Sequence, residues 1–285
     1  MNISKVISEI RVSKDVEDRL ESVLYELRTL IENYYMSGED FTISYLNSIQ
    51  KEELKANFKV EGYDEYFSSF VIDNLEHKNP LLTFNDNVLR EKKFSEENIL
   101  DLHNNLMENS VSKEELGKYR EKNVYVGVKG HKPDFIPPNH ELVPCYMKDF
   151  VKYLNDDIGD SVKDNLLIKS ALAHYFFVHI HPFVDGNGRM SRMLQQSVIW
   201  KDTFYDIGIN LPPICISNEF NKRKEEYFSI ENMLSENLYN NEAWNEWLIF
   251  NLDIISDSIY EISKNYKNIN NFYDNVQDLK TKKTR

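Results

Sequence analysis

The feature that most constrains the fold is the segment at residues 166–180, with the sequence LLIKSALAHYFFVHI. The segment predicts a helix that is apolar on nearly every side. Such a helix cannot lie on a protein surface, because one of its apolar sides would then face water. We therefore expect it at the buried centre of an all-α protein, with other helices packed around it.

The next residues, 181–192, read HPFVDGNGRMSR. Pro182 is expected to end the central helix near His181, because proline does not continue a helix comfortably. Residues 186–188 predict a tight turn, and residues 189–200, which contain no Gly or Pro, predict a second helix. The free N–H groups and the positive dipole end at the start of that helix form a candidate anion site.

The charged side chains of this motif suit phosphate chemistry. Arg189 and Arg192 are three residues apart, so they share a helix face and offer forked donors to phosphate groups. Asp185 is the candidate Mg²⁺ ligand, since Mg²⁺ prefers carboxylate and phosphate oxygens. His181 titrates near neutral pH and is the candidate general base, while Phe183 is expected to anchor the loop in the core. A plain glycine turn with two surface arginines is the alternative.

The motif resembles, without a mismatch, the signature of the Fic-domain family, His-Pro-Phe-x-(Asp/Glu)-Gly-Asn-Gly-Arg-x-x-Arg. Characterised members mostly transfer AMP from ATP to a hydroxyl side chain of a target protein. The resemblance implies that His181 deprotonates that hydroxyl and that Asp185 binds Mg²⁺. The related Doc group, which phosphorylates its target, usually alters the glycines or the last arginine, so the intact motif favours AMP transfer. The phosphate- and ATP-binding residues implied here are Phe183, Gly186, Asn187, Gly188, Arg189 and Arg192.

Residues 117–138 resemble the flap that positions the target protein in this family. Within them, residues 124–126 predict a short strand, and the glycines and prolines that follow, Gly130 among them, predict turns. A hairpin with a free edge can accept an extended peptide as an added strand. Without the resemblance, a plain surface hairpin is the alternative.

The side that receives the nucleoside departs from the family pattern. Where family members often have Asn-Arg ahead of two tyrosines, this chain has Arg223 and Lys224 ahead of Tyr227 and Phe228. Tyr227 is a candidate contact for the base, with a position in the core as the alternative. The departure leaves the choice of nucleotide open, so transfer from a nucleotide other than ATP is a second interpretation.

Many Fic proteins carry an inhibitory helix with the pattern Ser/Thr-x-x-x-Glu-Gly/Asn, whose Glu pairs with the second arginine of the motif. Two candidates lie in the N-terminal region, and each is incomplete. Glu32 precedes an Asn but lacks the Ser or Thr, and Glu52 has Ser48 at the right spacing but no Gly or Asn after it. Glu32 or Glu52 is the expected restraint on Arg192, and a charged residue on a solvated helix face is the alternative for each.

We expect the chain to divide into three parts. Residues 1–94 form a helical N-terminal extension with a candidate regulatory role, residues 95–262 form the catalytic core, and residues 263–285 form a partly disordered tail. Ser95, followed by two glutamates, predicts a helix N-cap. Near the end of the core, an apolar seam at alternating spacings of four and three predicts a helix packed on the core. The seam consists of Leu248, Leu252, Ile255, Ile259 and Ile262.

Composition limits the possible functions. The 285 residues carry a net charge of −13 with a pI of about 5.1, which argues against binding nucleic acid or an anionic membrane. The sequence shows no apolar run long enough for a membrane span and no apolar signal segment, so a cytoplasmic location is expected, with export by another route left open. Cys145 and Cys215 give no disulfide framework. His174 and His179, on the central helix, are expected to be core or near-site side chains and not zinc ligands.

The motif and the resemblance together predict a protein adenylyltransferase, a nucleotidyltransferase that AMPylates its target. The expected reaction is Mg²⁺-dependent transfer of AMP from ATP to a Ser, Thr or Tyr hydroxyl, with release of pyrophosphate. The acceptor is a target protein docked on the flap, or the protein itself. Removal of AMP from a modified protein is an alternative reaction, and a non-catalytic module that binds nucleotide or peptide is an alternative of another class. Formation of a homo-oligomer is left open.

Overall fold

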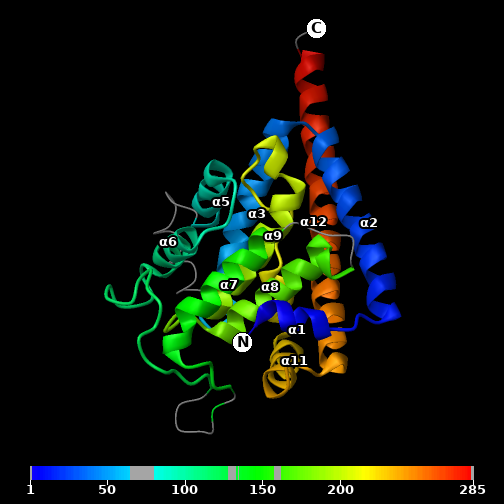
Figure 1. The fold of residues 1–285 in the computed structure, drawn as a ribbon. Coiled ribbons are helices and arrows are strands. Elements are labelled where there is room, and N and C mark those ends of the chain that lie inside the picture. The colour runs from blue at the N-terminus through cyan, green and yellow to red at the C-terminus, as the bar shows by residue number, and fades with distance from the viewer. Residues whose placement is uncertain (1, 65–79, 128–132, 134, 157–161, 284–285) are drawn as a thin grey trace.

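The computed structural model describes residues 2–64, 80–127, 133, 135–156 and 162–283, and Figure 1 shows its fold. These residues form α-helices joined by loops and short 3₁₀ turns, which confirms the all-α prediction. The α-helices are α1 (Ile3–Glu9), α2 (Lys14–Met36), α3 (Glu39–Val60), α5 (Pro80–Glu91), α6 (Glu96–Met107), α7 (Val143–Asn155), α8 (Leu166–Ile180), α9 (Asn187–Thr203), α10 (Ser217–Lys222), α11 (Lys224–Glu236) and α12 (Asn241–Lys283). The 3₁₀ turns lie at His140–Leu142, Val162–Asp164 and Tyr205–Ile207.

Helix α8 is the centre of the molecule, as its apolar sequence predicts. All of its residues are buried apart from Leu166 and His179. Helix α9 packs along α8 and is itself buried from Arg189 to Trp200. Because both helices are buried, the short loop at residues 181–186 that joins them is fixed at both of its ends.

The long helix α12 packs along α2 (Figure 1). The predicted apolar seam of α12 is buried at each of its five positions, which confirms that this helix packs on the core. Arg19 on α2 pairs with Asp253 on α12 at 2.7 Å. Helix α12 continues without a break to Lys283, across residue 263, where the sequence suggested the start of a separate tail.

The N-terminal helices form part of the same packed body. In α2, Ser13 caps the first turn, and the apolar residues Val16, Leu20 and Leu27 are buried. Helix α3 packs against both α9 and α10. This contact brings the C-terminal end of α3 to the glycine motif, which no local feature of the N-terminal sequence requires.

The flap differs from its prediction. Among the described residues its only pairing is one antiparallel bridge, in which the N–H of Val126 donates to Phe135 O at 3.0 Å and the N–H of Phe135 donates to Val126 O at 3.3 Å. The prediction of a strand at residues 124–126 is therefore wrong. Proline has no N–H to donate to a ladder, and positions 133, 137 and 138 are prolines. Residues 128–132 and 134 of the flap, Gly130 included, lie outside the described residues.

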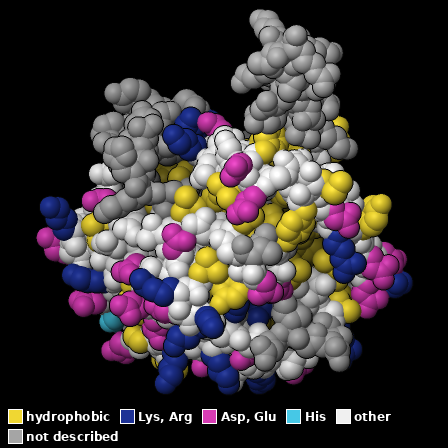
Figure 2. All heavy atoms as spheres, turned by 90° about the horizontal axis from the view of Figure 1, so that it is seen from above, with side chains coloured by type: hydrophobic (Ala, Val, Ile, Leu, Met, Phe, Trp, Pro, Cys, Tyr) yellow, Lys and Arg dark blue, Asp and Glu magenta, His cyan; other side chains and the backbone are white. Residues whose placement is uncertain are grey.

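The predicted cap at Ser95 is confirmed, since its hydroxyl accepts a hydrogen bond from the N–H of Asn98 at 3.2 Å. On the face drawn in Figure 2, Asp and Glu side chains are scattered among Lys and Arg side chains. Within the described residues, none of the helices combines the length and apolarity needed to cross a membrane.

Candidate active site

The loop between α8 and α9 has an unusual backbone. His181, the C-cap of α8, adopts the left-handed conformation with φ 51° and ψ 60°. Gly186, the N-cap of α9, is also left-handed with φ 87°. A Cβ atom at Gly186 would lie 2.7 Å from the sulfur of Met107, so both the backbone conformation and the lack of space require glycine here.

Phe183 and Asn187 hold this loop in place. The amide of Asn187 accepts a hydrogen bond from Phe183 N at 3.0 Å and donates one to Phe183 O at 2.9 Å. The ring of Phe183 is fully buried and stacks on His103 with a centroid distance of 3.7 Å. Phe183 is thus the core anchor that the sequence suggested, with its ring packed against His103.

His181 has the protonation state and tautomer of a general base. Its Nδ1 lies 3.2 Å from Val178 O, and because a carbonyl only accepts, this nitrogen carries the ring proton. The other ring nitrogen, Nε2, therefore has its lone pair available. Burial lowers the pKa of His181 to about 4, an effect increased by Arg120 and opposed by Glu61 and Asp185. The ring is accordingly neutral at pH 7.

The two arginines of the motif are buried in α9, with side chains 1% and 0% exposed for Arg189 and Arg192. Arg189 donates to Asp185 Oδ1 at 2.9 Å, and its guanidinium lies 4.9 Å from the ring centre of Phe58. Among the residues that the structure describes, Nε and Nη1 of Arg189 and Nη1 of Arg192 have no hydrogen-bond partner. Buried donors without partners are uncommon and costly, so these three atoms suit the oxygens of an anionic ligand.

Asp185 is the residue best placed for a metal ion. Its side chain is 46% exposed, and its Oδ1 also accepts from Gly186 N at 2.6 Å. One carboxylate beside phosphate oxygens is a ligand set that Mg²⁺ accepts. The described residues contain no group of three or more His, Cys, Asp or Glu side chains that could hold a metal ion by themselves. The residues present therefore fit a Mg²⁺ ion that shares its coordination with a nucleotide.

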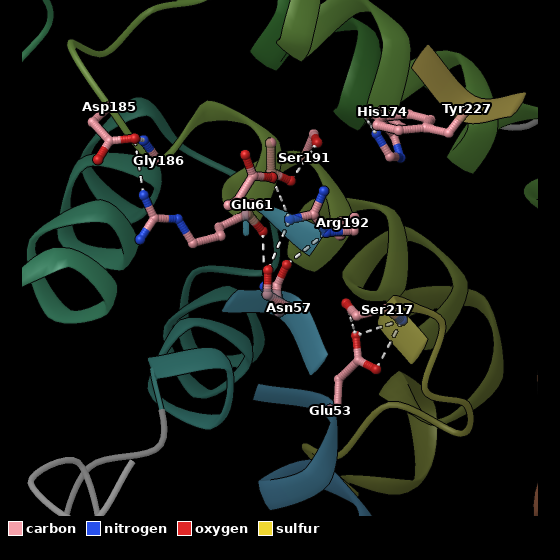
Figure 3. A network of polar contacts seen from close by, with 12 residues as sticks. Glu53, Asn57, Glu61, His174, Asp185, Gly186, Ser191, Arg192, Ser217 and Tyr227 are labelled. Carbon is pink, nitrogen blue, oxygen red and sulfur yellow. Dashed lines mark hydrogen bonds and ion pairs between the residues drawn. The ribbon is translucent and has the colours of Figure 1, made fainter. Parts of the chain in front are cut away.

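Helix α3 supplies a second set of contacts to Arg192, which Figure 3 shows. The carboxylate of Glu61 accepts from Nη2 at 2.7 Å, and the side-chain oxygen of Asn57 accepts from Nε at 2.6 Å. The backbone oxygen of Asn57 accepts from Nη2 as well, at 3.0 Å. The amide of Asn57 also donates to the backbone oxygen of Arg189 at 3.1 Å. The end of α3 therefore fills hydrogen-bonding positions of Arg192 that an anion would otherwise use.

This arrangement corrects the expectation for the regulatory residues. The structure places Glu61 on Arg192, whereas Glu52 is 73% exposed and pairs with Lys55, and Glu32 is exposed on α2. The segment from Asn57 to Gly62 has the family's spacing, with Glu and Gly at its end and Asn at its first position. The pattern with Ser or Thr at the first position does not include this segment, although an amide oxygen accepts hydrogen bonds equally well.

The position of Glu61 follows from the end of its helix. Glu61 is the C-cap of α3, and Gly62 then adopts φ 89°. Gly62 N donates to Lys59 O at 2.9 Å, which closes the last turn. A glycine after the C-cap is a common helix stop, because a side chain disfavours that conformation. Gly62 therefore fixes the point at which the Glu61 carboxylate leaves the helix.

A third residue of α3, Glu53, lies one helical turn before Asn57 and anchors the helix at a point further from the motif (Figure 3). Its buried carboxylate accepts from Gln196 Nε2 at 2.6 Å and from both the N–H and the hydroxyl of Ser217. Burial raises the pKa of Glu53, and these donors counteract that effect. Glu53, Asn57 and Glu61 recur every four residues, so one face of α3 carries a polar stripe that contacts α9.

Tyr227 is a core residue, 2% exposed. Its hydroxyl lies 3.1 Å from Nε2 of His174, whose Nδ1 lies 2.7 Å from the side-chain oxygen of Gln195. Because that amide oxygen only accepts, Nδ1 of His174 carries the proton and Nε2 accepts from Tyr227. Burial lowers the pKa of His174 to about 3 and raises the pKa of the neighbouring Glu231 to about 8. The sequence analysis identified Tyr227 and His174 but not Glu231. Glu231 lies one helical turn after Tyr227 on α11.

The residue that departs from the family pattern, Arg223, makes structural contacts. Arg223, at the position where family members often have Asn, pairs with Asp257 and Asp253 of α12. His179 stacks on Tyr175 and lies near Phe135 of the flap. Both side chains thus serve contacts between helices or between a helix and the flap.

Comparison with known proteins identifies similar sequences. A sequence model described as the Fic/DOC family matches residues 93–198. Protein adenylyltransferase Fic of Drosophila ananassae is 30% identical over 148 residues, covering 52% of this chain and 27% of that protein. The same-named protein of Drosophila mojavensis is 34% identical over 138 residues, covering 48% of this chain and 24% of that protein. The chain thus spans about a quarter of the length of these curated relatives.

Solved structures share the fold. A Fic family protein from Desulfovibrio desulfuricans superimposes with a TM-score of 0.64 at 19% identity, covering 90% of this chain and 76% of that chain. Fic-1 from C. elegans superimposes with a TM-score of 0.61 at 19% identity, covering 87% of this chain and 73% of that chain. The sequence match covers residues 93–198, and the solved structures share the fold over most of the chain.

Proposed function

We propose that this protein transfers AMP from ATP to a Ser, Thr or Tyr hydroxyl of a target protein. The observation that carries the proposal is the combination at the start of α9. A neutral histidine whose Nε2 carries a lone pair lies in the same loop as a carboxylate, and the helix that follows carries two buried arginines with N–H groups that have no partner within the described part of the chain. A base and an anion site within one loop and one helix end suit phosphoryl-group chemistry, in which positioning and charge neutralisation do most of the work.

In the proposed reaction, His181 accepts the proton of the target hydroxyl on Nε2. The hydroxyl oxygen forms a bond to the α-phosphorus, and the bond from that phosphorus to the oxygen bridging it to the β-phosphorus breaks. Pyrophosphate leaves with that bridging oxygen. Arg189 and Arg192 would bind the β- and γ-phosphates, which concentrates positive charge where the leaving group gains negative charge. Asp185 would hold a Mg²⁺ ion, whose role is to neutralise phosphate charge.

The proposal includes a restrained resting state. Glu61 already accepts a hydrogen bond from Nη2 of Arg192, and the Asn57 side chain accepts one from Nε. A γ-phosphate that binds Arg192 has to displace the Glu61 carboxylate, because two anions cannot share one buried guanidinium without strong repulsion. We therefore expect low activity in the unmodified protein and higher activity once Glu61 is removed.

The decisive experiment compares the wild type, Glu61→Gly and the double variant Glu61→Gly/His181→Ala. Each is incubated with Mg²⁺ and ATP labelled at the α- or the γ-phosphate, and protein-bound label and intact mass are measured. The proposal expects α-label and a mass gain of one AMP group in Glu61→Gly, weak label in the wild type, and none in the double variant. Label from the γ-position would instead indicate a kinase reaction, and tight ATP binding without any label would indicate a binding module.

Transfer from another nucleotide remains the second candidate, because Arg223 stands at a position where family members often have Asn. Competition tests it directly. Unlabelled GTP, CTP or UTP is added to the Glu61→Gly reaction with α-labelled ATP. An ATP-specific site keeps its label in the presence of equal GTP, CTP or UTP, whereas a site for another base loses the label to that competitor.

A further inference from the structure

Arg120, which lies in the flap segment, makes an unusual set of contacts. The residue is 3% exposed, and within the described part of the chain its guanidinium donates to backbone oxygens alone. No acidic side chain lies within ion-pair distance of it among the described residues. A buried cation that contacts carbonyl groups alone acts as a multiple hydrogen-bond donor, and its planar fork can bind several oxygens in fixed directions.

These oxygens come from two separate places in the chain. On the motif side, Nε of Arg120 donates to His181 O at 2.7 Å and Nη2 donates to Ile180 O at 3.5 Å. On the flap side, Nη1 donates to Lys122 O at 3.1 Å and Nη2 donates to Pro138 O at 2.5 Å. Lys122 and Pro138 lie on opposite sides of the bridge between Val126 and Phe135. One side chain thus joins both ends of the flap to the turn that carries the histidine.

The backbone adds a further link, since the N–H of Arg120 donates to Pro182 O at 2.9 Å. The carbonyl groups of residues 180, 181 and 182 are therefore all bound by Arg120. His181, in the middle, has the left-handed conformation that costs a non-glycine residue energy and persists only where its surroundings hold it. The contacts of Arg120 fix the direction of the His181 carbonyl and so restrain the ring's orientation.

We propose that Arg120 is a positioning residue that holds the flap and the His181 turn as one unit, and so sets the distance between a flap-bound peptide and the base. This inference rests on the proposed function. Arg120 is the residue that keeps the flap and the His181 turn in register. His103 makes a parallel link at the other end of the motif, where it contacts Gly117 N at 3.1 Å and Asp185 O at 3.1 Å, so Arg120 is the connection at the histidine end.

The test replaces Arg120 by Lys in the Glu61→Gly background. Lysine keeps the charge but has a single nitrogen, which cannot reach all four oxygens. Arg90→Lys, the same change at an exposed arginine of α5, is the matched control. The proposal expects kcat for AMP transfer to fall roughly 100-fold, as a misplacement of about 1 Å does. It also expects ATP affinity within twofold of the parent, because Arg120 has no contact with Arg189 or Arg192.

A purely structural role gives a different result. Loss of fold stability would lower ATP affinity, melting temperature and kcat together, and that outcome would overturn the proposal, as would unchanged kcat. Amide hydrogen exchange gives a readout that needs no catalysis. In Arg120→Lys, exchange should become faster at residues 120–127 and 180–183 together, with α12 unaffected. Faster exchange in only one of the two segments contradicts the proposal even if the protein transfers no AMP. Absence of label from the Glu61→Gly parent would overturn the proposed function alone.

Discussion

The carboxylate of Glu61 lies 2.7 Å from Nη2 of Arg192, although the two residues are 131 positions apart in the chain. Arg192 is fully buried, whereas the side chain of Glu61 is 29% exposed. A buried arginine needs a partner, and here the partner comes from the end of α3. The same arginine is the expected ligand of a phosphate group, so one contact links the stability of the resting protein to its activity.

Replacing Glu61 by Gly should raise AMP transfer roughly 10- to 100-fold, since a hydrogen bond between charged groups contributes about 1.5 to 3 kcal/mol. The same change should lower the melting temperature, because Arg192 loses its charged partner. Saturating Mg²⁺ and ATP should restore part of that stability, since a ligand that binds only the folded state stabilises it. Label incorporation and thermal denaturation measure the two effects.

Glu52→Ala is the matched control, because Glu52 lies on the same helix but is exposed and pairs with Lys55. Its activity and melting temperature should stay close to those of the wild type. If Glu52→Ala raised AMP transfer as much as Glu61→Gly, the restraint would not act through Arg192.

Replacing Glu53 by Ala should loosen α3 without removing the Glu61 carboxylate. The N–H and hydroxyl of Ser217 and the amide of Gln196 lose a buried acceptor, so we expect the free energy of unfolding to fall by about 2 to 4 kcal/mol. Activity should rise, but less than in Glu61→Gly. Denaturant unfolding and label incorporation would check this. A stability loss with unchanged activity would show that the position of Glu61 does not depend on this anchor.

The pH dependence of AMP transfer should reflect the lowered pKa of His181, which is about 4 and results mainly from burial. The base works in its neutral form, and a lowered pKa keeps it neutral to lower pH. Activity as kcat/KM for ATP, which reports the free enzyme, should therefore stay level from pH 8 to about pH 5 and fall as pH approaches 4. The charge of Glu61 raises this pKa, so its loss in Glu61→Gly should favour a fall at lower pH.

The measurement uses Glu61→Gly, and the fluorescence of its buried tryptophans reports at each pH whether the protein remains folded. A decline centred near pH 6.5 in a folded protein would mean that the titrating group is an ordinary exposed histidine and not His181 as the structure presents it.

Replacing Gly188 by Ala should abolish ATP binding even in the Glu61→Gly background. A Cβ atom at this position would lie 2.5 Å from Glu61 Oε1 and 3.3 Å from Arg192 Nη1, which is the space proposed for a phosphate group. Isothermal titration with ATP and Mg²⁺ measures the loss. Gly208→Ala serves as the control, because a Cβ there meets nothing within 4 Å and adds only local backbone strain. Normal ATP affinity in Gly188→Ala would place the phosphates elsewhere.

The sequence alone determined the helical class, the buried centre and the position of the loop at residues 181–186 that is proposed to be catalytic. Helix α8 was predictable because a helix that is apolar on every side has nowhere to lie but the core. The loop was predictable because its base, carboxylate, glycines and arginines are contiguous, and local geometry fixes how neighbours in sequence are placed. The cap at Ser95 and the seam from Leu248 to Ile262 depend on short-range spacing and were equally accessible.

Only the tertiary structure decided which carboxylate reaches Arg192. Glutamates four residues after a polar side chain are frequent in helices, and spacing cannot separate Glu52, which faces water, from Glu61, which faces α9. The choice depends on how α3 packs against α9 and α10 and on where Gly62 ends the helix. The same holds for Arg120, whose acceptors are backbone oxygens and so leave no mark in the sequence. Contacts between distant segments arise from packing, and a pattern along the chain does not encode them.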